Sequence, residues 1–138
     1  MGSLRTWLLG WGPSLVMMAL IFGGSSTPGN NLPSFSSWDT ILRKGGHVFG
    51  YALLGLSYMH GLAGSRKIKR RTLALAVIMA AAYAISDEFH QSFTPGRTAS
   101  VTDVVIDTFG AVIGVGVWSW VKSARDGTEG KAKSHLTE

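Results

Sequence analysis

The stretch DEFHQSFTPGRTASVTDVVID, residues 87–107, lies between two segments that are apolar enough to cross a bilayer. It carries four carboxylates, a histidine, a glutamine and an arginine. Ionisable groups at the edge of hydrocarbon are costly unless they pair, bind an ion or face water. Their concentration here predicts a functional site as well as a helix–turn–helix.

The spacing of these polar residues places them on two helix faces that a turn can bring together. Asp87 is followed by His90 three residues later and by Gln91 four residues later, so the three share one face of a helix. Asp103 and Asp107 are also four residues apart. The Thr-Pro-Gly-Arg segment between the two arms is typical of a turn, because proline fixes φ and glycine accepts positive φ. We expect the two polar faces to converge.

The composition of the whole chain is that of a membrane protein. Its 138 residues are 46% hydrophobic and 15% charged, with a mean hydropathy of +0.21 and no cysteine. The length fits a single domain. The absence of cysteine excludes a disulfide framework, a thiolate metal site and a thiol nucleophile.

Four apolar segments predict an all-α, polytopic membrane protein with four transmembrane helices in a small bundle. The expected spans are about residues 7–24, 45–64, 72–86 and 104–121. We expect the first span to be retained rather than cleaved as a signal peptide, because its two tryptophans resemble interfacial anchors and no A-x-A site follows. Residues 1–121 then form one membrane domain, and residues 122–138 form a polar, disordered cytoplasmic tail.

The basic residues follow membrane topology rather than a nucleic-acid-binding face. The net charge is +5, but ten of the thirteen Lys and Arg residues lie at Arg5, in the 66–71 cluster or after residue 121. The positive-inside rule assigns these residues and both termini to the cytoplasm. Arg43, Lys44 and Arg97 remain outside. We expect a multi-pass protein of the cell membrane, surrounded by membrane lipids, with no nucleic-acid partner.

Under this topology, three helix ends bring ionisable residues to the extracytoplasmic leaflet. The second span begins there, the third ends there and the fourth begins there. The candidate catalytic residues are Asp87, Glu88, His90, Asp103, Asp107 and His47. The candidate substrate-binding residues are Lys44, Gln91, Arg97 and Tyr51.

Small residues on two predicted spans indicate close helix contacts. Gly110 and Gly114 form a G-x-x-x-G pair on the stripe of the two aspartates of the fourth span, and Gly46 and Gly50 offer a second contact. An exposed G-x-x-x-G face would also allow a homodimer.

Four motifs resemble the VanZ-like family over about residues 38–116. They are K-x-x-H at 44–47, D-E-F-H-Q at 87–91, P-G-R-T at 95–98 and D-V-V-I-D-T-F-G at 103–110. The resemblance implies a small multi-helix membrane protein. It also implies a role in glycopeptide resistance or cell-envelope physiology, because the founding member is linked to resistance to teicoplanin, which acts outside the cytoplasmic membrane. It supplies no biochemical mechanism.

The first function that fits the cluster is a metal-assisted enzyme. Carboxylates and imidazoles are ligands of the type that hold Mg²⁺, Mn²⁺ or Zn²⁺, although no spacing here matches a specific metal signature. Lys44 and Arg97 could clamp a phosphate or carboxylate. Glu88 or a histidine would then act as general base on a lipid-linked substrate or a cell-wall precursor.

Two other functions remain open on the sequence. The same charges suit a non-catalytic binder or transporter of an anionic lipid headgroup or wall precursor. They also suit a purely structural network, with Arg97 paired to Asp103 and His47 paired to Asp87.

Overall fold

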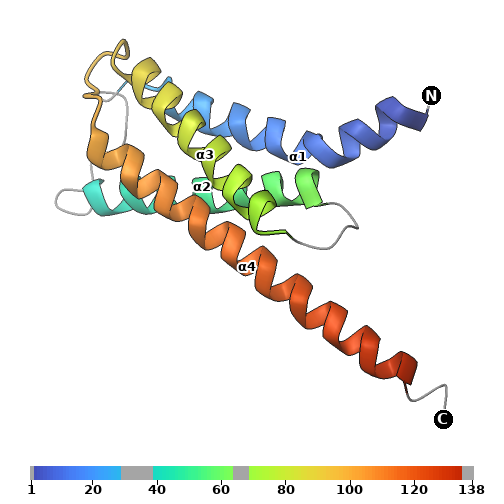
Figure 1. The fold of residues 1–138 in the computed structure, drawn as a ribbon. Coiled ribbons are helices and arrows are strands. Elements are labelled where there is room, and N and C mark those ends of the chain that lie inside the picture. Colours follow the sequence, from blue (N-terminus) through green and yellow to red (C-terminus); the bar gives the residue numbers. More distant parts are fainter. Residues whose placement is uncertain (1, 29–38, 64–68, 135–138) are drawn as a thin grey trace.

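A computed structural model describes residues 2–28, 39–63 and 69–134, and these ranges are helical apart from short connections. The helices are α1 (Gly2–Ser25), α2 (Asp39–Ala63), α3 (Arg70–Gln91) and α4 (Val101–Ser134). Successive helices run in opposite directions, and α4 continues well beyond the other three (Figure 1). The all-α prediction is confirmed. Each helix begins before its predicted span, because the backbone hydrogen bonds of a helix can include residues that are not apolar.

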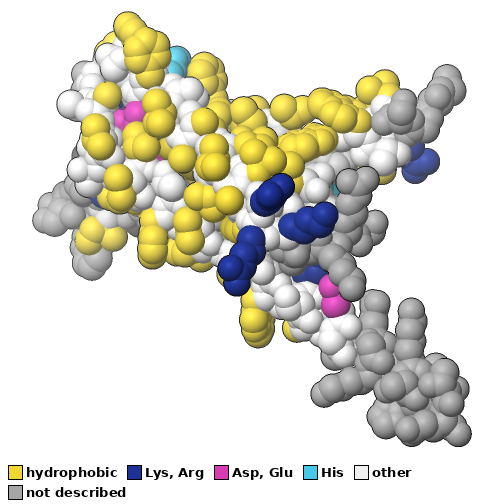
Figure 2. Space-filling view, viewed as in Figure 1, with side chains coloured by type: hydrophobic (Ala, Val, Ile, Leu, Met, Phe, Trp, Pro, Cys, Tyr) yellow, Lys and Arg dark blue, Asp and Glu magenta, His cyan; other side chains and the backbone are white. Residues whose placement is uncertain are grey.

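Three of these helices are long and apolar enough to cross a membrane, over Leu4–Ser25, Arg70–Gln91 and Val101–Gly127. Apolar side chains cover much of the visible face of the bundle (Figure 2). By the same criteria α2 is not among them. The structure therefore supports a membrane protein with three apolar spans, one fewer than the sequence predicted.

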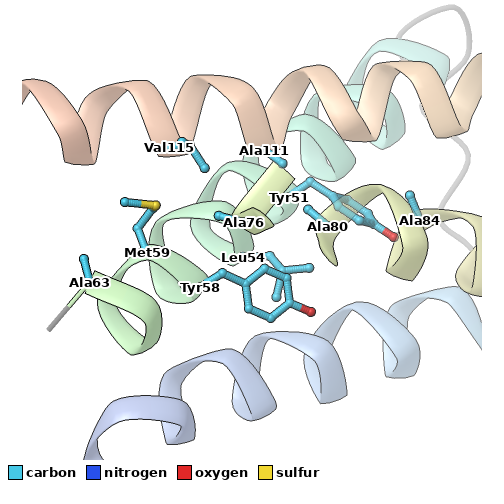
Figure 3. Close-up of a cluster of buried hydrophobic side chains, with 10 residues drawn as sticks. All are labelled: Tyr51, Leu54, Tyr58, Met59, Ala63, Ala76, Ala80, Ala84, Ala111 and Val115. Carbon is cyan, nitrogen blue, oxygen red and sulfur yellow. The ribbon is translucent and has the colours of Figure 1, made fainter. Parts of the chain in front are cut away.

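The position of α2 accounts for its lower apolarity. It contacts each of the other helices, whereas α1 and α4 make no contact with each other within the described ranges. The largest buried apolar side chains also come from α2, namely Tyr51, Leu54, Tyr58 and Met59 (Figure 3). A helix enclosed by other helices presents little surface to lipid, so its sequence can carry more polar residues.

Glycines allow α4 to pack directly against the backbone of α2. A Cβ atom at Gly110 would collide with the carbonyl oxygen of Val48, and one at Gly114 would collide with that of Ala52. The predicted G-x-x-x-G contact is confirmed. Because it is made within the chain, the same face is not exposed to a second copy.

The predicted small-residue contact on α2 is wrong at Gly46. Among the described residues, no side chain and no other helix comes within 4 Å of the position that a Cβ at Gly46 would occupy, and a Cβ at Gly50 would meet the Ile21 side chain at 3.6 Å. This face of α2 is turned toward the last turns of α1, where open space remains between the helices.

Helix α4 extends beyond the predicted fourth span into the residues that were predicted to form a tail. Residues 122–134 continue α4 rather than forming a disordered segment. An established helix propagates at little cost once its nucleus has formed, and Lys, Ala and Arg are good helix formers. Residues 135–138 of the predicted tail lie outside the described ranges.

The antiparallel course of the helices gathers the polar stretch at one end of the bundle. α1 and α3 end there, α2 and α4 begin there, and residues 92–100 connect α3 to α4 (Figure 1). Gly96 in this connection has a φ of 74°, which favours glycine, as the Pro-Gly turn predicted. We call this the polar end; it comprises residues 24–28, 43–51 and 87–107.

Candidate functional site

A cavity of about 450 Å³ lies at the polar end between α2, α3 and α4. The ionisable and amide side chains in its walls are Arg43, Lys44, His47, Glu88, Gln91, Arg97, Asp103 and Asp107. We call it the polar pocket. It collects seven of the ten candidate residues and leaves out Asp87, His90 and Tyr51.

An ion pair joins α2 to α4 in the wall of the pocket. Lys44 Nζ donates to Asp103 Oδ1 at 2.7 Å, and the two side chains are 44% and 33% exposed. The predicted pairing of Asp103 with Arg97 is wrong, because Arg97 turns toward α1. A pair this exposed contributes about 1 kcal/mol or less to stability.

A second pair joins the same two helices closer to the core. His47 Nδ1 lies 3.4 Å from Asp107 Oδ2, and the Asp107 side chain is fully buried. Asp107 Oδ1 is also buried and has no hydrogen-bond partner within the described part of the chain. The predicted partner of His47 was Asp87, so this pairing was wrong as well. A carboxylate that orients an imidazole beside a cavity is the arrangement of a general base.

Asp87 belongs to a hydrogen-bonded chain behind the pocket. Ser25 Oγ and Gln91 Nε2 both donate to Asp87 Oδ2, at 2.8 Å and 3.0 Å. Arg97 Nη1 in turn donates to Gln91 Oε1 at 3.2 Å. Such networks hold each member in one orientation. Asp87 therefore positions Gln91 and, through it, Arg97.

Arg97 also ties the α3–α4 connection to α1. Its Nη2 donates to the Gly24 carbonyl at 2.8 Å, and its Nε donates to the Thr27 carbonyl at 3.1 Å. Carbonyls at a helix C-terminus lack partners within the helix, and a cation there is favourable. Among the described residues, the three acceptors of Arg97 are neutral and no carboxylate hydrogen-bonds to its charge.

Arg43 lines the pocket beside Arg97. Burial, followed by the positive charge of Arg43, lowers the pKa of the Arg97 guanidinium from its ordinary value. A guanidinium nevertheless remains charged in proteins. With Lys44, three positive side chains line one pocket, where an anion would reduce the repulsion between them.

Glu88 and His90 make contacts that secure the surrounding backbone. Glu88 Oε2 accepts the backbone N–H of Ser100 at 2.7 Å, immediately before α4 begins. His90 Nε2 lies 3.1 Å from Ser26 Oγ, and its ring centroid is 4.3 Å from that of Phe22. His90 thus packs α3 against α1 outside the pocket.

The geometry does not favour a metal centre. Within the described ranges, no group of three or more His, Asp or Glu side chains is placed to hold a metal ion. The candidate ligands are distributed over separate pairs instead. The groups that the described part of the pocket offers are its charged and hydrogen-bonding side chains.

Two site residues were missing from the sequence prediction. Arg43 directly precedes Lys44 in the sequence, and this position beside a predicted site residue was the available signal. Ser25 lies just beyond the predicted first span of residues 7–24, yet it ends α1 and its Oγ donates to Asp87. A small polar residue directly after a long apolar run was the available signal.

These features define a helical membrane protein with a polar pocket at one end of its bundle. The chain belongs to the VanZ/LLP1 family, whose model matches residues 11–122. The match confirms the predicted resemblance and extends it into α1. Comparison with curated proteins and with solved structures finds no match.

Proposed function

We propose that this protein binds the anionic group of a membrane-embedded envelope molecule in the polar pocket. One observation carries the proposal: Arg43, Lys44 and Arg97 line a single cavity at the end of an apolar bundle. Basic residues in such a position are costly unless they serve a partner or a ligand.

The chemistry of the pocket suits phosphate or carboxylate. A guanidinium has five N–H donors in a planar fork that matches both anions, and Arg97 uses Nε, Nη1 and Nη2 for one bond each. Two donors remain for a ligand. Each of the three carboxylates that line the pocket has a partner, since Asp103 pairs with Lys44, Glu88 accepts the Ser100 N–H and Asp107 Oδ2 faces His47.

We place the pocket on the extracytoplasmic side, with α2 as a fourth membrane crossing enclosed by its neighbours. Lys69, Arg70 and Arg71 lie at the opposite end of the bundle, which the positive-inside rule assigns to the cytoplasm. Membership of a VanZ-like family supports a role in glycopeptide resistance or envelope physiology. Recognition of an external anionic envelope component is compatible with either.

The His47–Asp107 pair favours a second candidate function, hydrolysis of an ester bond in the bound molecule. His47 Nδ1 faces the buried carboxylate, which leaves Nε2 to accept a proton. A water molecule would attack the ester, its proton would pass to His47, and the leaving alcohol would take that proton. This reaction needs no ligand other than water and the ester.

Anion binding is tested with phosphatidic acid, a simple phosphate-bearing lipid, in phosphatidylcholine nanodiscs. We expect Arg43→Gln to weaken its retention by about tenfold, because a charge-assisted hydrogen bond contributes about 1.5–3 kcal/mol. Native mass spectrometry of purified nanodiscs measures the retained lipid. Arg70→Gln, at the opposite end, is the matched control and should behave as wild type. Equal loss in both variants, or no preference for phosphatidic acid in wild type, would overturn the proposal.

A further inference from the structure

A second cavity, of about 320 Å³, lies between α1 and α2. Its apolar walls are side chains of α1 and glycine backbone of α2: Met17, Leu20, Ile21, Gly46 and Gly50. We call it the α1–α2 groove. Leu20 is 63% exposed, so the groove borders the outer surface of the bundle rather than its core.

The groove and the polar pocket meet. Arg43, His47 and Arg97 line both cavities. A molecule whose anionic group contacts these side chains would therefore have a polar chamber on one side and an apolar channel on the other.

The groove has the depth of one membrane leaflet. From Met17 to Ser25, its wall on α1 covers eight residue steps, or about 12 Å at about 1.5 Å per residue. Half of a hydrocarbon core is about 15 Å. The groove thus runs from the polar end toward the middle of the bilayer without crossing it.

We propose that the α1–α2 groove holds a hydrocarbon chain of a bilayer lipid whose phosphate-bearing headgroup occupies the polar pocket. This inference rests on the proposed function and names its ligand class. A water-soluble anion would gain nothing from an apolar wall. A lipid chain moves from the bilayer into the groove without leaving apolar surroundings, because lipid tails and apolar side chains are equally apolar. The charges of the pocket then select the headgroup.

Tyr51 supplies a second observation at the junction. It lines the groove, its side chain is fully buried, and its hydroxyl has no hydrogen-bond partner within the described residues. A buried hydroxyl without a hydrogen-bond partner is unfavourable, because it has lost its bonds to water. The ester oxygens of a glycerolipid, which lie between headgroup and chain, are acceptors of the kind that this donor lacks.

Two adjacent glycines provide a matched test. A Cβ at Gly46 or at Gly45 would meet no atom within 4 Å, but only Gly46 lines the groove. We expect Gly46→Leu to fill the groove and weaken retention of phosphatidic acid in phosphatidylcholine nanodiscs by about tenfold or more. Gly45→Leu should leave retention unchanged. Water-soluble glycerol 3-phosphate should bind wild type and Gly46→Leu equally, because it has no chain.

The outcomes separate the two proposals. Normal phosphatidic acid retention in Gly46→Leu, with reduced retention in Arg43→Gln, would overturn the groove assignment and leave anion binding in place. Glycerol 3-phosphate that binds as tightly as phosphatidic acid would also overturn it, because the chain would then contribute nothing. Retention that is unaffected in both variants would overturn both proposals.

Discussion

The role of Asp107 most clearly distinguishes a pocket that only binds a ligand from a pocket that also catalyses a reaction. Its side chain is fully buried, its Oδ2 faces His47, and its Oδ1 has no partner within the described ranges. A buried carboxylate with so few partners is expensive, and such groups concentrate at functional sites. A carboxylate that merely joined α2 to α4 could be replaced by its amide at little chemical cost.

We therefore expect Asp107→Asn to remain in the membrane at wild-type abundance but to slow ester hydrolysis by about 100-fold or more, the usual contribution of general-base catalysis. The reason is that the amide keeps the shape of the side chain but removes the charge that orients His47. Mass spectrometry of the cleaved lipid in phosphatidic acid nanodiscs measures the rate.

His60→Gln is the control for this experiment, because His60 lies near the opposite end of α2 and is exposed. It should cleave lipid at the wild-type rate, and His47→Gln should be as slow as Asp107→Asn. A wild-type protein that produces no cleaved lipid would refute catalysis and leave the pocket as a binding site.

For individual residues, the helical period predicted which side chains share one face of a helix. It did not predict their partners on the neighbouring helices. Spacings of three and four residues placed Asp87 with Gln91 and Asp103 with Asp107, because the period fixes the face of each helix. The partners of Lys44 and His47 depend on the axial register between α2 and α4. The helical period within one helix does not determine that register, so the sequence paired Asp103 and His47 with the wrong residues.

Among the elements, the register of α2 against α4 is set by glycine. Gly110 and Gly114 let the backbone of α4 rest on the carbonyls of Val48 and Ala52, and Val48 directly follows His47. This contact fixes the height at which the Lys44–Asp103 and His47–Asp107 pairs form. The G-x-x-x-G motif predicted a close contact with another helix, but it did not show which helix that would be.

A single added methyl group should reveal this role. We expect Gly114→Ala to destabilise the bundle by about 1–3 kcal/mol, because overpacking a close contact forces the backbones apart. Gly116→Ala is the matched control, since a Cβ there would meet no atom within 4 Å. Because alanine favours helix over glycine, Gly116→Ala should be neutral or stabilising by up to about 1 kcal/mol.

Unfolding of both variants in detergent, followed by circular dichroism against added denaturing surfactant, measures the difference. If the two variants unfold at the same point, α4 does not rest on α2 through this face. The pairs in the pocket would then need another explanation for their register.

In the whole molecule, charged and polar residues are concentrated at the two ends of the bundle rather than along one of its faces. The pocket and the groove occupy one end, Lys69, Arg70 and Arg71 occupy the other, and exposed apolar side chains such as Val16 and Ile78 lie between. The sequence predicted this arrangement well because hydrophobic spans and loop charges are local quantities. The sequence did not predict that α2 could be less apolar than the other helices. Its enclosure by three neighbouring helices is a property of the assembled bundle.

This polarity makes the topology directly testable, because the chain contains no cysteine and any introduced thiol is unique. Ala99, in the α3–α4 connection, and Ser123, in the far part of α4, are both exposed. With ten of the thirteen Lys and Arg residues assigned to the cytoplasmic side, we expect a membrane-impermeant maleimide to label Ala99→Cys in intact cells and to label Ser123→Cys only after lysis.

Labelling of Ser123→Cys alone in intact cells would place the pocket in the cytoplasmic leaflet and remove the extracytoplasmic part of the proposed function. Labelling of both positions would mean that α4 does not cross the membrane, although its apolar span over Val101–Gly127 is long enough to do so.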